Sequence, residues 1–225
     1  HLEWKLSPLY FNPMNARLKN TGGIYLITPD MADTARLCTQ VESLLRQPVA
    51  LLQYRNKTAS GELRRQQAKA LRELARQAGV PLIINDDWQL ALDIGADGVH
   101  LGGEDAEPGR VRAALGEALI IGVSCYNDLQ RARQLSLEAV DYLAFGAVFA
   151  SQTKPNAGHA GLDVLRAAKA FGKPIVAIGG ISPDNSAEVS AAGADYLAVI
   201  SGIFSAASPE RALASYLNTF QRQYP

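Results

Sequence analysis

Eight short apolar runs alternate with segments of helical periodicity from Gly23 onward, and this alternation constrains the fold more than any other feature. The runs are apolar along their length, as expected for parallel strands that are covered on both faces. Between them, apolar residues recur at helical spacing, for example in 63–78. The expected strands are 24–28, 49–54, 81–84, 98–101, 119–123, 142–145, 174–178 and 196–200.

A short motif repeats where helical segments give way to strands. Residues 94–100 (IGADGVH) and 192–198 (AGADYLA) share Gly-Ala-Asp, and 138–144 (EAVDYLA) is a looser copy. Glycine suits the left-handed position that closes a helix. Eight β/α units of this length predict an α/β fold, a single (β/α)8 TIM barrel over residues 21–225. A doubly wound sheet is the alternative, but it normally carries a glycine-rich turn after its first strand, and here Thr28-Pro29-Asp30 follows instead.

Composition and charge argue against several classes of partner and location. The chain has 225 residues, with 22 basic and 22 acidic ones, so the absence of a net positive charge argues against a nucleic-acid partner. No apolar run is long enough to span a membrane. The two cysteines, Cys38 and Cys125, form neither a disulfide framework nor a metal motif, which predicts a cytoplasmic protein. We expect residues 1–20 to be an N-terminal extension or remnant outside the barrel, and the sequence leaves open whether the chain forms a homo-oligomer.

The run Gln53-Tyr54-Arg55-Asn56-Lys57 ends the second expected strand. Alternate side chains of a strand share one face, so Gln53, Arg55 and Lys57 should project together while Tyr54 and Asn56 point away. An amide and two cations on one face suit a phosphate or diphosphate. The alternative is a frayed strand end with ordinary surface charges.

Polar residues also follow the other strands. In a TIM barrel the carboxyl ends of the strands build the active site. Asp86 and Asp105 follow the third and fourth strands and would face cations from Arg55, Lys57 and Lys154, so a diphosphate there would require Mg²⁺ between the carboxylates and the phosphate. Helix capping is the alternative role for the aspartates. Gly179-Gly180 and Ser201-Gly202, after strands 7 and 8, predict a second phosphate site built from backbone N–H groups, with glycines kept for tight turns as the alternative. His100 is expected to be a packed, hydrogen-bonded side chain.

These pieces together resemble the thiamine-phosphate synthase family over about residues 22–220. The matching segments are Gln53-x-Arg55-x-Lys57, Ile84-Asn85-Asp86, Asp97-Gly-Val-His100, Gly103-Glu104-Asp105, Gly122-Val-Ser124, Ser151-Gln-Thr153-Lys154, Ile178-Gly-Gly-Ile181 and Val199-Ile-Ser201. The family joins hydroxymethylpyrimidine diphosphate to hydroxyethylthiazole phosphate and releases pyrophosphate.

The resemblance implies a role for each group of residues. The pyrimidine diphosphate would be held by the run Gln53, Tyr54, Arg55, Asn56 and Lys57 together with Asn85, Ser124 and Lys154. Among these, Arg55, Lys57, Ser124 and Lys154 would assist the chemistry. One Mg²⁺ would bind Asp86 and Asp105, although Asp87 leaves the choice of the first ligand open. The thiazole phosphate would be held by Ser151, Gln152, Thr153, Gly180, Ile200 and Ser201.

Three rival functions remain at this stage. A thiazole tautomerase, as a sister group, uses a histidine after the fifth strand, where this chain has Ser124-Cys-Tyr126. A sugar-phosphate isomerase or epimerase needs a positioned base, which the two anion sites with Mg²⁺ carboxylates fit poorly. A non-catalytic sensor of thiamine precursors would be supported by a degraded site, but Asp86, Asp105 and Lys154 are all present. The expected partners are therefore small phosphorylated molecules.

Overall fold

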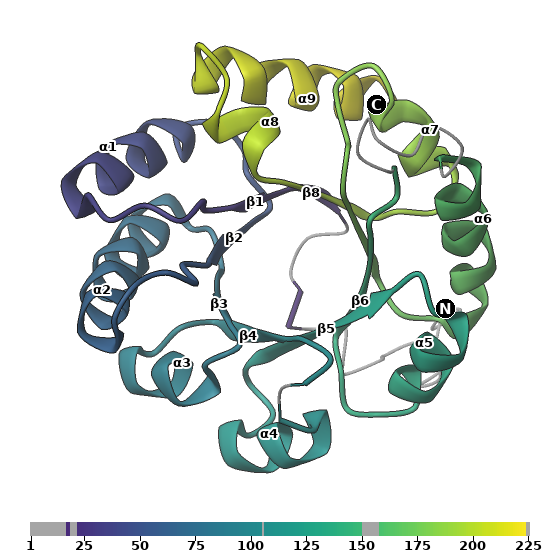
Figure 1. The fold of residues 1–225 in the computed structure, drawn as a ribbon, viewed down its shortest axis with the longest axis horizontal. Helices are drawn as coiled ribbons and strands as arrows, with labels where there is room; N and C mark the ends of the chain where they lie inside the picture. The colour runs from purple at the N-terminus through teal and green to yellow at the C-terminus, as the bar shows by residue number, and fades with distance from the viewer. Residues whose placement is uncertain (1–16, 19–21, 105, 150–157, 224–225) are drawn as a thin grey trace, which may run out of the picture.

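Eight parallel strands close into a barrel, with each strand paired to the next and β1 paired to β8. This is a computed structural model, and it describes residues 17–18, 22–104, 106–149 and 158–223. Viewed along the barrel axis, the strands form an inner ring and the helices surround it (Figure 1). The predicted TIM barrel is confirmed.

The elements alternate along the chain as the sequence predicts. The strands are β1 Gly23–Ile27, β2 Leu51–Tyr54, β3 Leu82–Asn85, β4 Gly98–Leu101, β5 Ile120–Tyr126, β6 Tyr142–Phe145, β7 Ile175–Ile178 and β8 Tyr196–Val199. The helices are α1 Thr34–Leu44, α2 Gly61–Ala78, α3 Trp88–Ile94, α4 Pro108–Leu115, α5 Leu129–Ser136, α6 Gly158–Ala168, the short 3₁₀ helix η2 Lys169–Phe171, α7 Ser186–Ala191, α8 Ser201–Phe204 and α9 Pro209–Gln223.

Strand β5 extends three residues beyond the predicted end at Val123. Its pairing with β6 continues through Ser124, then shifts register before Tyr126, which pairs with Phe145. A bulge of this kind bends the strand and redirects side chains. Residues 124–126 lie beyond the expected strand 119–123, but their backbone remains in the sheet.

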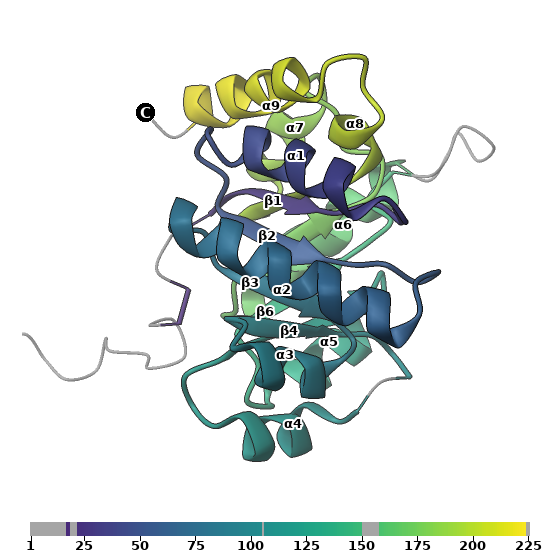
Figure 2. The ribbon, with the colours of Figure 1, turned by 90° about the vertical axis from the view of Figure 1, so that its left-hand side faces the viewer.

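Two apolar cores result from the two faces of the strands. The larger core lies between the strands and the surrounding helices, and the smaller one fills the barrel interior. Figure 2 shows the helices packed along the outside of the strands. The interior core includes three tyrosines, Tyr25, Tyr142 and Tyr196, each at most 1% exposed. The interior is therefore a packed floor beneath the mouth.

The aspartates of the repeated motif fasten neighbouring strands together. Asp97 accepts a hydrogen bond from the backbone N–H of Leu82 (2.8 Å), and Asp195 accepts one from Ile175 (2.8 Å). Asp141, in the looser copy, accepts one from Ile121 (2.8 Å). Each aspartate precedes an even-numbered strand and binds the start of the strand before it, so the repeat reflects one recurring structural contact.

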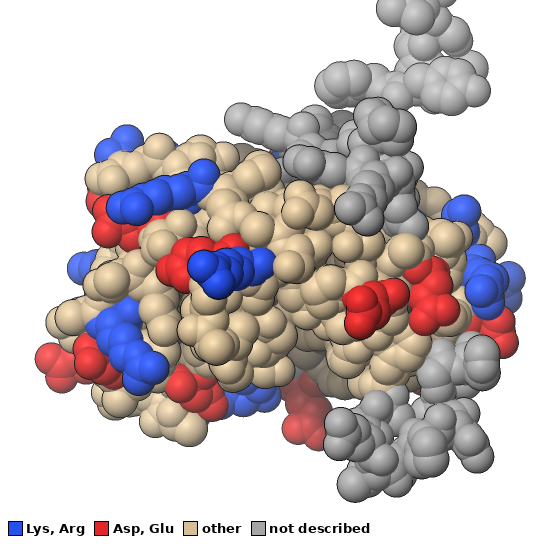
Figure 3. Space-filling view, turned by 90° about the horizontal axis from the view of Figure 1, so that it is seen from above, with Lys and Arg blue, Asp and Glu red and all other residues tan. Residues whose placement is uncertain are grey.

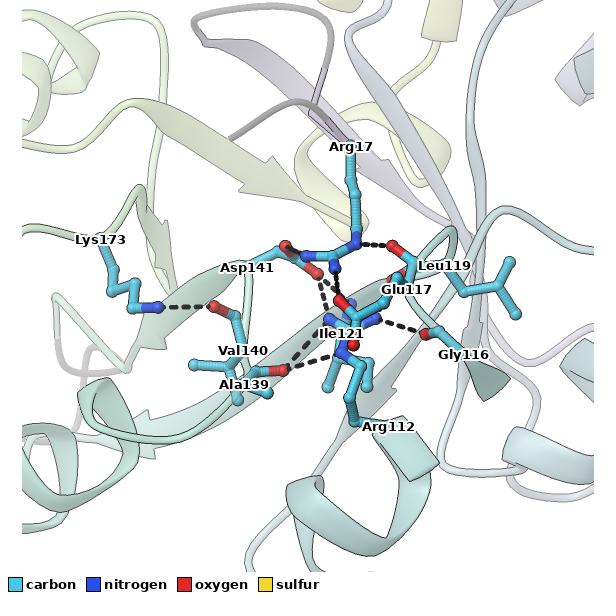
Figure 4. A network of polar contacts seen from close by, with 10 residues as sticks. All are labelled: Arg17, Arg112, Gly116, Glu117, Leu119, Ile121, Ala139, Val140, Asp141 and Lys173. Atoms are coloured by element: carbon cyan, nitrogen blue, oxygen red, sulfur yellow. Dashed lines mark hydrogen bonds and ion pairs between the residues drawn. The ribbon is translucent and has the colours of Figure 1, made fainter. Parts of the chain in front are cut away.

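Arg17 and Leu18 contact the barrel floor, although they lie in the segment that the sequence sets apart. Leu18 is buried in the interior core. Arg17 donates to Asp141 (2.8 Å) and also pairs with Glu117, while Arg112 donates to the other carboxylate oxygen of Asp141 (2.7 Å; Figure 4). These contacts lie at the strand starts, opposite the mouth.

Charges of both signs are interspersed on the face seen in Figure 3, where no continuous basic patch is visible among the described residues. This matches the balanced charge of the sequence. Among the described helices, none combines the length and apolar character needed to cross a membrane.

Candidate functional site

A cavity of about 380 Å³ opens at the carboxyl ends of the strands. One part of its wall is apolar and comes mainly from β1, β6, β7 and β8. The other part is polar and comes from the ends of β2 to β5. Its lining residues are Tyr25, Ile27, Gln53, Arg55, Lys57, Asn85, Asp86, His100, Gly102, Ser124, Tyr126, Ala144, Gly146, Val176, Ile178, Ala198 and Ile200. A flat ring could bind the apolar part while charged groups bind the polar one.

The predicted direction of the Gln53–Lys57 run is confirmed. Gln53, Arg55 and Lys57 all line the cavity. The loop after β1 holds this strand end in place: the Arg55 N–H donates to Thr28 Oγ1 (3.0 Å), and the Lys57 N–H donates to Asp30 Oδ1 (2.9 Å). Asp30 also lies 3.7 Å from the Arg55 guanidinium. The backbone that carries the two cations is thus held in place at the mouth rather than frayed.

Tyr54 and Asn56 point away from this cavity. The Tyr54 hydroxyl donates to Gln67 Oε1 (2.6 Å), and Asn56 Nδ2 donates to the same oxygen (3.0 Å). Both side chains are buried beside α2 and line a neighbouring cavity of about 250 Å³. Burial raises the pKa of Tyr54 to about 12, so its hydroxyl stays neutral. In this structure they support the run rather than face the main cavity.

The two neighbouring aspartates after β3 have different contacts in the structure. Asp87 caps α3, because its Oδ1 accepts a hydrogen bond from the Leu90 N–H (2.9 Å). Asp86 lines the main cavity beside Asn85 and has a φ of 63°. That left-handed backbone is uncommon for a residue other than glycine and is often found at functional sites. Asp86 is the aspartate of this pair that faces the main cavity.

Ser124 lies on the polar wall and contacts His100. The distance between Ser124 Oγ and His100 Nε2 is 2.7 Å, and His100 Nδ1 lies 2.8 Å from the Tyr142 hydroxyl. The ring of His100 stacks on that of Tyr142. The prediction of a packed, hydrogen-bonded His100 is confirmed, but His100 also lines the cavity.

Three of the residues predicted to hold the second phosphate, Gly180, Ile200 and Ser201, follow the ends of β7 and β8. Ile200 lines the cavity, whereas Gly180 and Ser201 are exposed beyond its edge. Gly180 has a φ of 66°, and its carbonyl accepts a hydrogen bond from Asn185 Nδ2 (2.9 Å). Ser201 begins α8. Five other predicted residues lie outside the described part of the chain: Asp105, Ser151, Gln152, Thr153 and Lys154.

The sequence analysis missed most of the apolar wall. Those residues belong to strands that read as uniformly apolar, so no compositional signal distinguishes the inward-facing positions. The barrel structure shows which positions face inward, because alternate residues of a barrel strand point to the interior, as Val176 and Ile178 do on β7. The missed cavity residues are Tyr25, Ile27, Gly102, Tyr126, Ala144, Gly146, Val176, Ile178 and Ala198.

Tyr126 is a missed residue with a defined contact. It follows the bulge of β5, has a φ of 55°, and its hydroxyl accepts a hydrogen bond from the Gly103 N–H (3.0 Å). Its ring lies 5.7 Å from the Arg131 guanidinium. Tyr126 therefore links the ends of β4 and β5 at the rim.

Comparisons with known proteins identify the family of this chain. The family described as thiamine monophosphate synthase matches residues 24–203. A curated thiamine-phosphate synthase of Xylella fastidiosa (strain 9a5c) is 49% identical over 95% of this chain and 89% of its own. One from Azoarcus sp. (strain BH72) is 53% identical over 85% of this chain and 94% of its own.

A solved structure gives the same result. Thiamine phosphate pyrophosphorylase from Pyrococcus furiosus superposes with a TM-score of 0.79 and 31% identity, covering 92% of this chain and 98% of that one. The matched segment contains the strand ends that build the cavity. The resemblance inferred from the sequence motifs is confirmed, and the chain belongs to the thiamine monophosphate synthase family.

Proposed function

We propose that this chain catalyses the thiamine-phosphate synthase reaction, the joining of hydroxymethylpyrimidine diphosphate to hydroxyethylthiazole phosphate with release of pyrophosphate. Family membership over most of the chain is the observation that carries this proposal. The cavity supports it, because cations, amides and a carboxylate line one part and apolar side chains the other. The rival tautomerase, isomerase and sensor functions have no support among these relatives.

The pyrimidine ring would bind between the apolar wall and the polar floor. Val176, Ile178 and Ala198 offer apolar contacts, while Gln53 and Ser124 offer hydrogen-bonding groups. The diphosphate would extend toward Arg55 and Lys57 at the mouth. These cations stabilise the negative charge that develops on the leaving pyrophosphate, and a preformed site does so without reorganisation.

The reaction then needs charge stabilisation and alignment more than a base. The bond between the pyrimidine methylene carbon and the diphosphate oxygen breaks, and its electron pair leaves with pyrophosphate. The thiazole nitrogen lone pair forms the new bond to that carbon. An anchored thiazole phosphate, near Gly180, Ile200 and Ser201, would align this nucleophile.

Asp86 fits a role as a Mg²⁺ ligand. Its carboxylate and the neighbouring Asn85 amide supply the hard oxygen donors that Mg²⁺ prefers, at the cavity that would hold the diphosphate. Asp105 would be the second ligand, as the sequence predicts. When bound, Mg²⁺ would neutralise charge on the diphosphate oxygens. Mg²⁺ is usually held in such sites by one or two carboxylates together with substrate phosphate oxygens.

The free thiols of Cys38 and Cys125 suit the reducing cytoplasm in which we place the protein.

The deciding experiment mixes the two substrates with Mg²⁺ and measures pyrophosphate and thiamine phosphate. Equal amounts of both products support the proposal, whereas release of pyrophosphate without thiamine phosphate contradicts it.

A second experiment tests the metal site. Asp86→Asn should weaken Mg²⁺ binding in titrations with the pyrimidine diphosphate present, while Asp93→Asn, on the outer helix α3, should not. Unchanged Mg²⁺ affinity in Asp86→Asn would remove Asp86 from the metal site.

A further inference from the structure

A continuous chain of hydrogen bonds crosses the barrel interior beneath the cavity. Gln53 Nε2 donates to the Tyr25 hydroxyl (2.9 Å), which lies 2.8 Å from the Tyr142 hydroxyl. Tyr142 contacts His100 Nδ1 (2.8 Å), and His100 Nε2 contacts Ser124 Oγ (2.7 Å). Five strands contribute one residue each, and we call these five residues the interior chain. Its two ends, Gln53 and Ser124, line the cavity, as do Tyr25 and His100, whereas Tyr142 does not.

Each internal member of the chain has one proton to donate. Burial raises the pKa values of Tyr25 and Tyr142 well above that of an ordinary tyrosine, so both keep their hydroxyl protons at neutral pH. A neutral imidazole likewise carries one N–H and presents one acceptor nitrogen. When one member donates to its neighbour, that neighbour's own proton is directed to the next member. The directions of successive hydrogen bonds are therefore linked.

The Gln53 amide sets the direction of the hydrogen bonds along the interior chain. Tyr25 accepts from the Gln53 amide, which leaves its own proton available for the Tyr142 hydroxyl 2.8 Å away. In that direction Tyr142 would donate to His100 Nδ1, the His100 proton would lie on Nε2, and Nε2 would donate to Ser124 Oγ. Ser124 would accept this bond and keep its own proton for the cavity. In the opposite direction, Ser124 would spend its proton on His100 and could only accept.

We propose that the interior chain fixes Ser124 as a hydrogen-bond donor to the substrate, with Tyr142 and His100 as positioning residues for substrate specificity. This inference rests on the proposed function for the identity of the ligand, a pyrimidine diphosphate. The group that Ser124 recognises is a ring-nitrogen acceptor of a flat heterocycle. A 4-aminopyrimidine presents such a nitrogen beside its amino donor. Its 4-oxo analogue carries a proton on that nitrogen and an acceptor oxygen, which inverts the pattern.

Tyr142 is the residue at which the hydrogen bonds of the interior chain can be interrupted. It is fully buried and does not line the cavity, so Tyr142→Phe removes one internal hydroxyl and leaves both ends in place. Tyr196→Phe is the matched control, because Tyr196 is buried in the same interior core but is not one of the five residues. Thermal denaturation of both variants shows whether each remains folded.

The first measurement is the tautomer of His100 in the ligand-free protein. The whole protein contains three histidines, so its ¹⁵N spectra are simple, and His100→Gln assigns the His100 signals. We expect a neutral ring with its proton on Nε2 in the wild type and in Tyr196→Phe, and a mixture of tautomers in Tyr142→Phe. A proton on Nδ1 in the wild type, or an unchanged tautomer in Tyr142→Phe, overturns the inference.

The second measurement is discrimination between the 4-aminopyrimidine diphosphate and its 4-oxo analogue, as the ratio of their kcat/KM values. Removing a fixed donor should lower this ratio by about tenfold in Tyr142→Phe, the effect of one lost polar contact. Tyr196→Phe should keep the wild-type ratio. Equal ratios in the wild type and Tyr142→Phe would overturn the role in specificity. If the wild type makes no thiamine phosphate, the proposed function fails, and the tautomer measurement still tests the interior chain.

Discussion

Gly122 and Tyr142 lie opposite one another in the β5–β6 ladder, and the Tyr142 ring fills the space that a side chain on Gly122 would need. A Cβ at Gly122 would overlap the ring atoms of Tyr142. Tyr142 is fully buried, so its ring has no free space to move into. The glycine is thus required by a neighbour in space rather than by a turn.

Gly122→Ala should therefore destabilise the barrel and displace Tyr142. Overpacking of this kind typically costs about 1–3 kcal/mol of unfolding free energy. Gly61→Ala is the control, because a Cβ there meets no atom within 4 Å. Urea denaturation should show a loss for Gly122→Ala and little change for Gly61→Ala. Equal stabilities would show that the Tyr142 ring adapts without cost.

The buried carboxylate of Asp141 should matter far more than an exposed one. Asp141 is fully buried between Arg17 and Arg112, at 2.8 and 2.7 Å. Asp141→Asn removes the negative charge beside two cations, and breaking a buried pair costs about 3–5 kcal/mol. Asp163→Asn breaks a pair of similar length, 2.8 Å, whose side chains are 57% and 75% exposed. That loss should be about 0–1 kcal/mol, and comparable losses for the two variants would contradict the structural argument.

Arg55→Ala should impair turnover of the pyrimidine diphosphate. Loss of one charged group on the leaving pyrophosphate should lower kcat/KM by about a hundredfold or more. The KM for the thiazole phosphate should change much less, since Arg55 follows β2 whereas the residues predicted to hold that phosphate follow β7 and β8. Arg65→Ala is the matched control, because Arg65 pairs with Asp93 on the outer surface. A larger effect on the thiazole phosphate would place Arg55 at the other phosphate.

Alkaline pH should destabilise the protein through its buried thiol. Burial raises the pKa of Cys125 from an ordinary 9.0 to about 12. The unfolded chain therefore ionises first, so the stability from the neutral thiol is complete below about pH 9 and is lost as pH rises toward about 12. The loss is at most about 1.4 kcal/mol per pH unit for this group. Buried tyrosines such as Tyr54 act in the same direction above their ordinary pKa.

Urea denaturation between pH 8 and pH 11 measures this effect. Cys125→Ala should reduce the pH dependence between pH 9 and pH 10, where the tyrosines of the unfolded chain are still mostly neutral. The native thiol should also resist alkylation at pH 8, whereas urea should expose it. An identical pH dependence in the wild type and Cys125→Ala would refute the assignment.

The strand ends of the site could be read from the sequence because their signals are local. A strand alternates its side chains, so Gln53, Arg55 and Lys57 had to share one face, and the cavity contains all three. The repeated Gly-Ala-Asp motif could be recognised as a joint between elements. Its hydrogen bonds to Leu82 and Ile175 could not, because each partner begins a different strand.

The sequence by itself determined eight β/α units, the family, and the direction of the charged side chains, because periodicity and motif spacing are properties of neighbouring residues. Only the tertiary structure decided that Asp86 rather than Asp87 faces the cavity, since the choice depends on the cap of α3. It also decided that Tyr25 meets Tyr142 across 117 positions of the chain. Barrel closure brings distant strands together around one interior, and no local pattern of residues encodes which side chains meet there.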